Sequence, residues 1–181
     1  NVDYVGKIPT PALMLYGIKQ ARPTVMVTGS HIPFDRNGIK FGKLSGEVLK
    51  EEEEAILEVV KQTRAFEYGK PVEQSQFDDD GMLKRKVALP PVNTEGASDY
   101  LKRYTNFFPP GVLTGMRVIV FQHSAVGRDL LVKVLKALGA IVSVSGRSEN
   151  FIPIDTEDIS VDRLVELQRM VDESDGVDAL V

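Results

Sequence analysis

The amino-acid sequence predicts an α/β protein with mixed or parallel sheets flanked by helices, and three observations lead to that class. Residues 116–181 alternate strand, helix, strand, helix and strand, which is typical of βαβ units around a parallel sheet. Residues 50–64 carry apolar side chains at the spacing of an amphipathic helix. Residues 24–27 form a short apolar run that ends at turn-forming residues, which predicts a strand.

Before residue 108 the pattern predicts helices at residues 12–20, 50–64 and 96–107 and extended segments at residues 24–27 and 41–49. The run at 24–27 is too apolar for an exposed sheet edge, so we expect a buried strand there. Glycines at positions 42 and 46 are expected to break the second extended segment. Glu51–Glu54 fill the first turn of the helix at 50–64, where acidic side chains favour the positive end of the helix dipole.

The strongest boundary signal in the chain is Phe108-Pro109-Pro110-Gly111. We therefore expect two domains, residues 1–108 and 109–181. Beyond the boundary, the expected elements are strands at 116–121, 140–144 and 177–181, a helix at 128–138, and a helix at 161–173 capped by Ser160. His123 follows the first of these strands and is interpreted as an ordinary turn residue.

Composition excludes several classes of function. The 181 residues carry a net charge of −4 and a pI of about 5.3, which gives no basic footprint for nucleic acid or an anionic membrane. The chain has no cysteine, so disulfides, thiol catalysis and cysteine-ligated zinc are excluded. Its two histidines, His31 and His123, argue against a histidine-rich metal site. With no apolar run of membrane-spanning length and no signal-peptide pattern, we expect a cytoplasmic protein.

Residues 27–41, VTGSHIPFDRNGIKF, place a serine and a histidine directly after the predicted strand and bring back a lysine ten residues after the serine. A hydrolase reading is weak, because the G-x-S-x-G elbow is absent and the adjacent Ser30 and His31 project apart. A nucleotide-binding loop is not indicated, because neither glycine-rich motif is present. A phosphoserine at Ser30, with Lys40 turned back by Asn37-Gly38, remains open beside an ordinary strand-exit turn.

These residues resemble the active-serine loop of the α-D-phosphohexomutases, the phosphomannomutase and phosphoglucomutase family. The family pattern T-A-S-H-N-P stands here as Thr28-Gly29-Ser30-His31-Ile32-Pro33, and the family's N-G-[IFLM]-K stands as Asn37-Gly38-Ile39-Lys40. Upstream, residues 6–12 (GKIPTPA) resemble the family's G-x-x-P-T-P-A segment, and the later strand and helix pattern resembles its second domain. Gly29 for alanine and Ile32 for asparagine depart from the pattern, and the second change removes a polar group near the serine.

The resemblance implies a reaction and a set of site residues. Phosphorylated Ser30 would donate its phosphoryl group to a hexose 1-phosphate or 6-phosphate and receive the other one back. Lys40 would be the general acid/base or charge partner, and His31 would hydrogen-bond in or near the loop. Thr28, Gly29, Asn37 and Gly38 would shape the loop and support substrate binding.

The family also implies parts that this sequence does not contain. Its magnesium loop, D-G-D-x-D-R, has no counterpart in the 181 residues, so a phosphoserine oxygen at Ser30 would be the one Mg²⁺ ligand that this chain supplies. We therefore expect the later part of a first phosphohexomutase domain and most of a second, taken from a longer enzyme, and no catalysis by the excerpt alone. The alternative is a non-catalytic structural or partner-docking module. Neither the preference among mannose, glucose and glucosamine nor the oligomeric state follows from the sequence.

Overall fold

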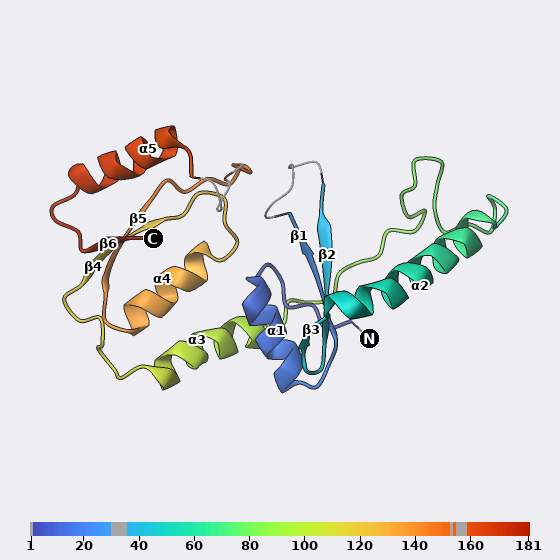
Figure 1. Cartoon of the computed structure of the whole chain (residues 1–181), viewed down its shortest axis with the longest axis horizontal. Coiled ribbons are helices and arrows are strands. Elements are labelled where there is room, and N and C mark those ends of the chain that lie inside the picture. The colour runs from blue at the N-terminus through green and yellow to red at the C-terminus, as the bar shows by residue number, and fades with distance from the viewer. Residues whose placement is uncertain (1, 30–35, 153, 155–158) are drawn as a thin grey trace.

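The structure is a computed structural model that describes residues 2–29, 36–152, 154 and 159–181. Its elements follow the order helix, three strands, two helices, and then an alternation of strands and helices (Figure 1). They are α1 (Thr10–Lys19), β1 (Thr24–Thr28), β2 (Gly38–Lys43), β3 (Gly46–Glu47), α2 (Lys50–Tyr68), α3 (Glu95–Phe107), β4 (Arg117–Phe121), α4 (Arg128–Ala137), β5 (Ile141–Ser145), α5 (Val161–Asp172) and β6 (Ala179–Leu180). The α/β class is therefore confirmed.

The first sheet is an antiparallel meander in the order β1-β2-β3. Its register pairs Thr24 with Gly42, Met26 with Lys40, and Thr28 with Gly38. Gly42 therefore lies inside a strand, and the expectation that it breaks the extended segment is wrong. Its missing side chain allows a close approach instead, because an added Cβ would lie 2.3 Å from Thr24 Oγ1 and 2.6 Å from Met14 Sδ.

Helix α1 covers one face of this sheet and forms the first hydrophobic cluster of the molecule. Its members are Val5, Ile8, Ala12, Leu13 and Tyr16, with Met26, Ala97 and Tyr100 packed against them. The phenol of Tyr16 donates a hydrogen bond of 2.5 Å to the Asp3 carboxylate, and the Asn93 amide donates to both groups. Three segments far apart in sequence are thereby joined.

The other face of the first sheet is apolar and exposed within the described chain. Because side chains alternate along a strand, Val25, Val27, Ile39 and Phe41 share this face, and each is 40% exposed or more. The expectation of a buried strand at residues 24–27 is therefore wrong for the described residues, where β1 has β2 as its one partner and forms an edge. The apolar pattern identified the strand, but it carried no information about what lies opposite that face.

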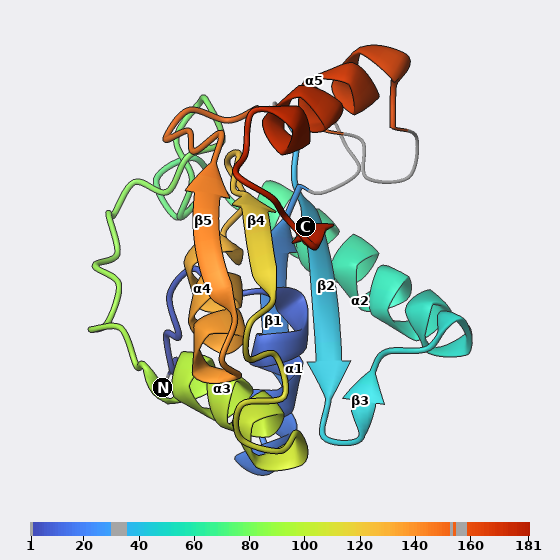
Figure 2. The ribbon, with the colours of Figure 1, turned by 90° about the vertical axis from the view of Figure 1, so that its left-hand side faces the viewer.

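The second sheet is parallel, in the order β5-β4-β6, as the alternating pattern predicts (Figure 2). Val118 and Val120 of β4 pack with Ala140, Leu131 and Leu135 to form the second hydrophobic cluster, and α4 contacts both β4 and β5. Helix α3 packs against α1 on one side and α4 on the other, so it bridges the two sheets. The domain boundary at residues 108 and 109 stays a prediction.

Helix α2 is longer than expected and none of its residues is buried in the described structure. It begins after Leu49, whose N–H donates to the Glu52 carboxylate, and Lys43 pairs with the same group at 2.7 Å. After α2, the chain forms a turn in which the Asp78 carboxylate accepts from two backbone N–H groups, as expected of an Asp-Gly turn. At α5, Ser160 caps the helix by accepting from Arg163 N, which confirms that prediction.

Candidate functional site

The predicted serine loop is the connection between β1 and β2. Strand β1 ends at Thr28 and β2 begins at Gly38, and these two residues are directly paired. Ser30 and His31 lie outside the described residues, as do Ile32 and Pro33. The structure therefore describes only the base of the loop, formed by Thr28, Gly29, Asn37 and Gly38 at the two ends of the motif. The roles of Ser30 and His31 stay predictions.

The base of the loop is narrow because Gly29 has no side chain. A Cβ at Gly29 would lie 3.3 Å from the Arg36 carbonyl oxygen and 3.7 Å from Asn37 Oδ1. Thr28, Gly29, Asn37 and Gly38 are thus brought together as one unit, as the motif predicts. An alanine at position 29, the residue in the family pattern, would fit after a shift of a few tenths of an ångström.

Lys40 lies on β2 opposite Met26, two residues beyond the base of the loop. Side chains of alternate residues share a face, so Lys40 is on the same face as Met26, Thr28 and Gly38. Two residues along a strand span about 6.8 Å, which a lysine side chain can cover. The Asn-Gly pair does not turn the chain by itself, since Gly38 is already part of β2; strand alternation sets the face of Lys40.

A second group of polar residues lies at the carboxyl end of the parallel sheet, where ligands bind in open α/β sheets. Arg128, the first residue of α4, donates from Nη1 to the His123 carbonyl oxygen at 2.8 Å and also to the Ser148 carbonyl oxygen. Its Nη2 donates to Glu149 Oε1 at 2.8 Å. Ser148 N donates to the same His123 oxygen, so the turns after β4 and β5 are tied together.

His123 has an unusual conformation within this group. Its φ is 31°, in the region that favours glycine, and its Nδ1 is enclosed without a hydrogen-bond partner among the described residues. Burial, together with Arg163 and Arg128, holds the pKa of its imidazole below the usual value, so the ring is neutral at pH 7. His123 lies in a turn, as the sequence predicts, although with a backbone conformation that the sequence does not indicate.

The charges around this group are paired. A hydrogen bond from Arg147 lowers the pKa of the Asp129 carboxyl, and the nearby Arg128 charge lowers that of Glu149. Arg147 donates to Asp129 at 2.6 Å, to Glu149 at 3.1 Å and to the buried Gln122 side chain at 3.2 Å. Unlike Arg128, Arg147 donates these hydrogen bonds to side chains and not to backbone carbonyl oxygens.

A cavity of about 490 Å³ lies between the two halves of the chain. Its lining includes Pro9 before α1, Tyr100 and Tyr104 on α3, and Phe121 and His123 at the end of β4. Tyr104 donates a hydrogen bond of 2.8 Å to Tyr100, and burial, followed by this bond, raises the pKa of Tyr100 to about 12. Both views show β1, β4 and β5 running toward the same end of the molecule (Figures 1 and 2).

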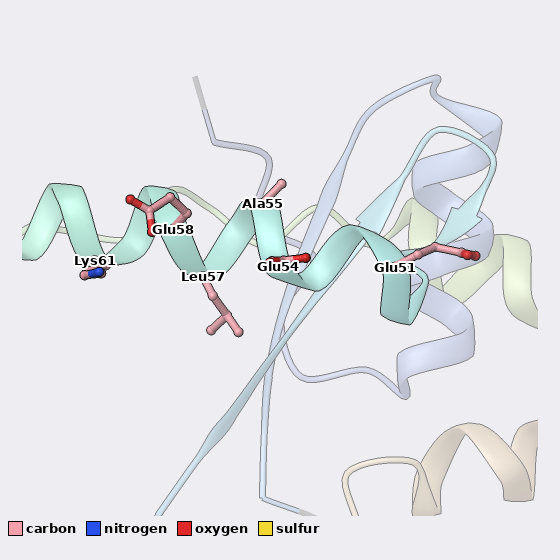
Figure 3. A pocket seen from close by; sticks show the side chains of 6 residues that line it. All are labelled: Glu51, Glu54, Ala55, Leu57, Glu58 and Lys61. Atoms are coloured by element: carbon pink, nitrogen blue, oxygen red, sulfur yellow. The ribbon is translucent and has the colours of Figure 1, made fainter.

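The acidic run on α2 does not form a metal site. Figure 3 shows Glu51, Glu54 and Glu58 spread along the helix with their carboxylates separated, as expected of neighbours on a solvated helix. Within the described part of the chain, no group of three or more histidine, cysteine, aspartate or glutamate side chains could hold a metal ion. The same described residues include no helix long and apolar enough to cross a bilayer.

The structure combines an antiparallel sheet, in which β1 and β2 are joined by the serine loop, with a separate parallel sheet. A known protein family matches the first part of this chain. Residues 1–67 match the family Phosphoglucomutase/phosphomannomutase, alpha/beta/alpha domain I. The chain is 41% identical over 159 residues to a phosphomannomutase of Salmonella muenchen, covering 88% of this chain and 29% of the relative. It is 42% identical over 155 residues to a phosphomannomutase of Sinorhizobium fredii, covering 86% of this chain and 30% of the relative.

More distant relatives carry a different name. A phosphoglucosamine mutase of Methylobacillus flagellatus is 28% identical over 156 residues, which cover 85% of this chain and 31% of that protein. The comparisons confirm the resemblance to the phosphohexomutase family that the serine-loop motif predicts. It spans about 30% of the length of the curated relatives that it matches.

Proposed function

We propose that the protein to which this chain belongs is a phosphohexomutase that interconverts hexose 1-phosphate and hexose 6-phosphate through a phosphoserine at Ser30. The observation that carries the proposal is the paired base of the loop, where Thr28 lies opposite Gly38 and both motif halves meet in one connection. Its relatives at 41–42% identity are phosphomannomutases, which supports mannose phosphate as the first substrate to test.

The proposed step transfers a phosphoryl group between two oxygens. A hydroxyl oxygen of the sugar phosphate forms a bond to the phosphorus on Ser30 while the bond from phosphorus to Ser30 Oγ breaks. The hydroxyl proton leaves to a base, and Ser30 Oγ regains a proton. The sugar bisphosphate then reorients and transfers its other phosphoryl group to Ser30 Oγ. The phosphoserine is thereby re-formed, and the sugar leaves with its single phosphate on the other carbon.

Lys40 is proposed to act in this step as the proton carrier or as a charge partner of the phosphoryl group. Lys40 on β2 lies on the same face of the sheet as Thr28, the last residue of β1 before the loop that contains Ser30. A phosphoryl transfer site works by positioning and charge neutralisation, so a cation held on a rigid strand suits the task.

Magnesium is proposed as the metal of the full-length enzyme, because a hard cation with oxygen ligands offsets charge in phosphoryl transfer. The described residues do not fit such a site by themselves, since they contain no cluster of three or more candidate ligands. We therefore assign no step of the reaction to the metal.

The test is a coupled assay of the full-length protein with mannose 1-phosphate, glucose 1-phosphate and glucosamine 1-phosphate. We expect turnover of at least one substrate, a phosphopeptide containing Ser30, and a loss of turnover of 10³-fold or more in Ser30→Ala, by order of magnitude. Ser45→Ala, in the turn between β2 and β3, is the matched control and should remain active.

The 181-residue chain alone serves as the negative control in the same assay, and we expect it to be inactive. It represents about 30% of the length of its relatives and offers no acidic cluster in its described part. Near-normal turnover by Ser30→Ala without added sugar bisphosphate would contradict the phosphoserine assignment.

A further inference from the structure

Asn37 differs from the other asparagines of the chain in the residue that follows it. It is followed by glycine, whereas valine, threonine or phenylalanine follows each of the others. A glycine has no side chain to hinder an approach to its backbone nitrogen, and its backbone adopts the widest range of conformations. The nitrogen of Gly38 is therefore better placed than any other in the sequence to attack the amide of a preceding asparagine.

The Asn37 side chain is free to take part in such a reaction. It is exposed, and it makes no hydrogen bond within the described part of the chain. Asn93 is the opposite case, because its amide nitrogen donates to the side chains of Asp3 and Tyr16. Its amide oxygen accepts from Glu95 N. An amide held at both ends cannot turn toward the following nitrogen, whereas that of Asn37 can.

The backbone of Asn37 and Gly38 lies at the end of the strand ladder. Gly38 is the first residue of β2 and pairs with Thr28, the last residue of β1, so no further pair follows on the side of the loop. Asn37 itself lies outside the strand. The ends of elements open locally at a lower free energy than their centres. The Gly38 nitrogen can therefore leave the ladder while the pairs from Val27 to Thr24 stay formed.

From these observations we propose that Asn37 deamidates spontaneously in the folded enzyme and that the product is inactive. The Gly38 nitrogen forms a bond to Asn37 Cγ, and the bond from Cγ to the side-chain nitrogen breaks. Ammonia leaves with the proton that Gly38 N loses. Water then opens the cyclic imide at either carbonyl, which gives an aspartate or an isoaspartate. The inactivation rests on the proposed function, whereas the deamidation does not.

The reaction changes both charge and backbone at the base of the serine loop. Asn37 Oδ1 lies 3.7 Å from the position that a Cβ would take on Gly29, the residue before Ser30 in the sequence. Deamidation gives this group a negative charge, which repels the phosphoryl group proposed for Ser30. Isoaspartate also lengthens the main chain by one methylene group next to the pair of Thr28 and Gly38. Either product is therefore expected to lower turnover.

The first readout is the mass of one peptide from the full-length protein. The folded protein is incubated in a mildly alkaline buffer made with heavy-oxygen water, and is then digested in ordinary water. Trypsin cuts after Arg36 and Lys40, which releases residues 37–40 as a single peptide. Heavy oxygen in this peptide marks deamidation that took place before the digestion. The same protein unfolded in urea shows how fast the reaction runs without the fold.

Two controls are available. Gly38→Ala adds a Cβ that would lie 3.4 Å from the Thr28 carbonyl oxygen, an ordinary contact, but that hinders the attack. Asn150 in the same sample is exposed like Asn37 but is followed by Phe151, and it needs no variant. We expect the peptide of residues 37–40 to gain heavy oxygen about tenfold faster than either control, since neither has an Asn-Gly sequence.

The second readout is mutase turnover over the same incubation. Wild-type turnover should fall in proportion to the deamidated fraction, and freshly prepared Asn37→Asp should have kcat/KM about tenfold below that of the wild type. Gly38→Ala should keep its own starting turnover throughout. Label in urea but none in the folded protein would overturn the deamidation, and full turnover after labelling would overturn the inactivation. Absent turnover at the start would contradict the proposed mutase function and leave the labelled peptide as evidence for the deamidation.

Discussion

At the scale of single residues, Lys40 and Lys43 show how strand alternation separates two lysines on β2. Lys40 shares the face of Met26 and Thr28, whereas Lys43 lies an odd number of residues away. Lys43 is engaged with Glu52 at 2.7 Å at the start of α2. The two side chains have the same chemistry but different surroundings, so they form a matched pair.

Lys40→Gln in the full-length enzyme is expected to lower kcat by about 10²-fold, the order of loss for a proton carrier or a charge partner in phosphoryl transfer. Lys43→Gln should leave kcat within about twofold of the wild type, since it loses a partly exposed ion pair only. Steady-state kinetics with mannose 1-phosphate measures both values. Equal kcat values for the two variants would remove Lys40 from the mechanism.

The Asp3–Tyr16–Asn93 group gives a prediction about pH. Hydrogen bonds from Tyr16 and Asn93 lower the pKa of the Asp3 carboxyl, and the bond to Asp3 raises the pKa of Tyr16 to about 12. A carboxyl with a lowered pKa in the folded state contributes stability that is present above its unfolded value of 3.8. That contribution is lost as the pH falls through the lowered pKa of the folded state.

Tyr16→Phe should therefore lower the thermal midpoint at pH 7 by about 2–4 °C, the effect of one hydrogen bond in a chain of this size. The difference from the wild type should shrink as the pH falls below 3.8 and through the lowered pKa of Asp3, where this carboxyl becomes protonated. Tyr68→Phe on the exposed end of α2 is the control and should change little. A difference that is the same at pH 7 and at acid pH would contradict the role given to the Asp3 charge.

At the scale of elements, the packing of α1 on the first sheet depends on close approach. An added Cβ at Gly17 would lie 2.3 Å from Thr24 Cγ2 and 3.0 Å from the Arg22 carbonyl oxygen. Alanine is the better helix former by about 1 kcal/mol, but the contact with a buried, β-branched side chain opposes this gain. The distance between α1 and β1 at this position is therefore too short for any side chain larger than that of glycine.

Gly17→Ala is expected to lower the free energy of unfolding by about 1–2 kcal/mol after the helix gain is subtracted. Thr24→Ser removes the methyl group that the new Cβ would meet, so the double variant should recover much of the loss. Urea unfolding followed by circular dichroism gives these values. A Gly17→Ala variant as stable as the wild type would show that α1 can shift outward without cost.

Much of the element pattern could be predicted from the sequence, because apolar spacing and turn residues are local. The alternation of β4, α4, β5, α5 and β6 follows from such signals, and the Ser160 cap is a one-residue signal. Helix α2 continues to Tyr68, beyond the expected end at residue 64, because no strong stop signal precedes Gly69. The backbone conformation of the turn at His123 depends on hydrogen bonds from Arg128 and Ser148 to the His123 carbonyl oxygen. Such side-chain and long-range contacts leave no pattern in the local sequence.

The candidate site was predicted in part for the same reason. Thr28, Gly29, Asn37, Gly38 and Lys40 lie near one another because they belong to one hairpin, and their roles in the site stay predictions. The sequence could not indicate that the Arg128 side chain joins the carbonyl oxygens of His123 and Ser148, since these contacts link the turns that follow two different strands. The roles of Ser30 and His31 stay predictions.

At the scale of the whole molecule, two apolar surfaces lack cover within the described residues. One is the face of Val25, Val27, Ile39 and Phe41 on the first sheet, at whose edge β1 lies. The other is α2, where Leu57, Val59 and Phe66 are each at least 60% exposed. An apolar sheet face beside an open edge strand favours association between copies.

The 181-residue chain is therefore expected to self-associate at micromolar concentration, as measured by sedimentation velocity. Replacing the cross-strand pair Val27 and Ile39 with threonine should shift the chain toward the monomer, because threonine keeps the strand preference but makes the face polar. Val87→Thr in the irregular segment before α3 is the control and should leave association unchanged. A wild-type chain that is monomeric at high concentration would contradict this prediction.

The antiparallel pairing of β1 and β2 also has an evolutionary consequence. Thr28 and Gly38 close the loop across from each other, so insertions or deletions between them need not change the ladder below. The interval from Gly38 to Lys40 has no such freedom. Deleting Ile39 would move the lysine to the face of Val25 and Val27, because a shift of one residue reverses every side chain of a strand. Among descendants of this sequence the loop can vary in length, while the spacing of Asn37-Gly38-Ile39-Lys40 must be inherited intact.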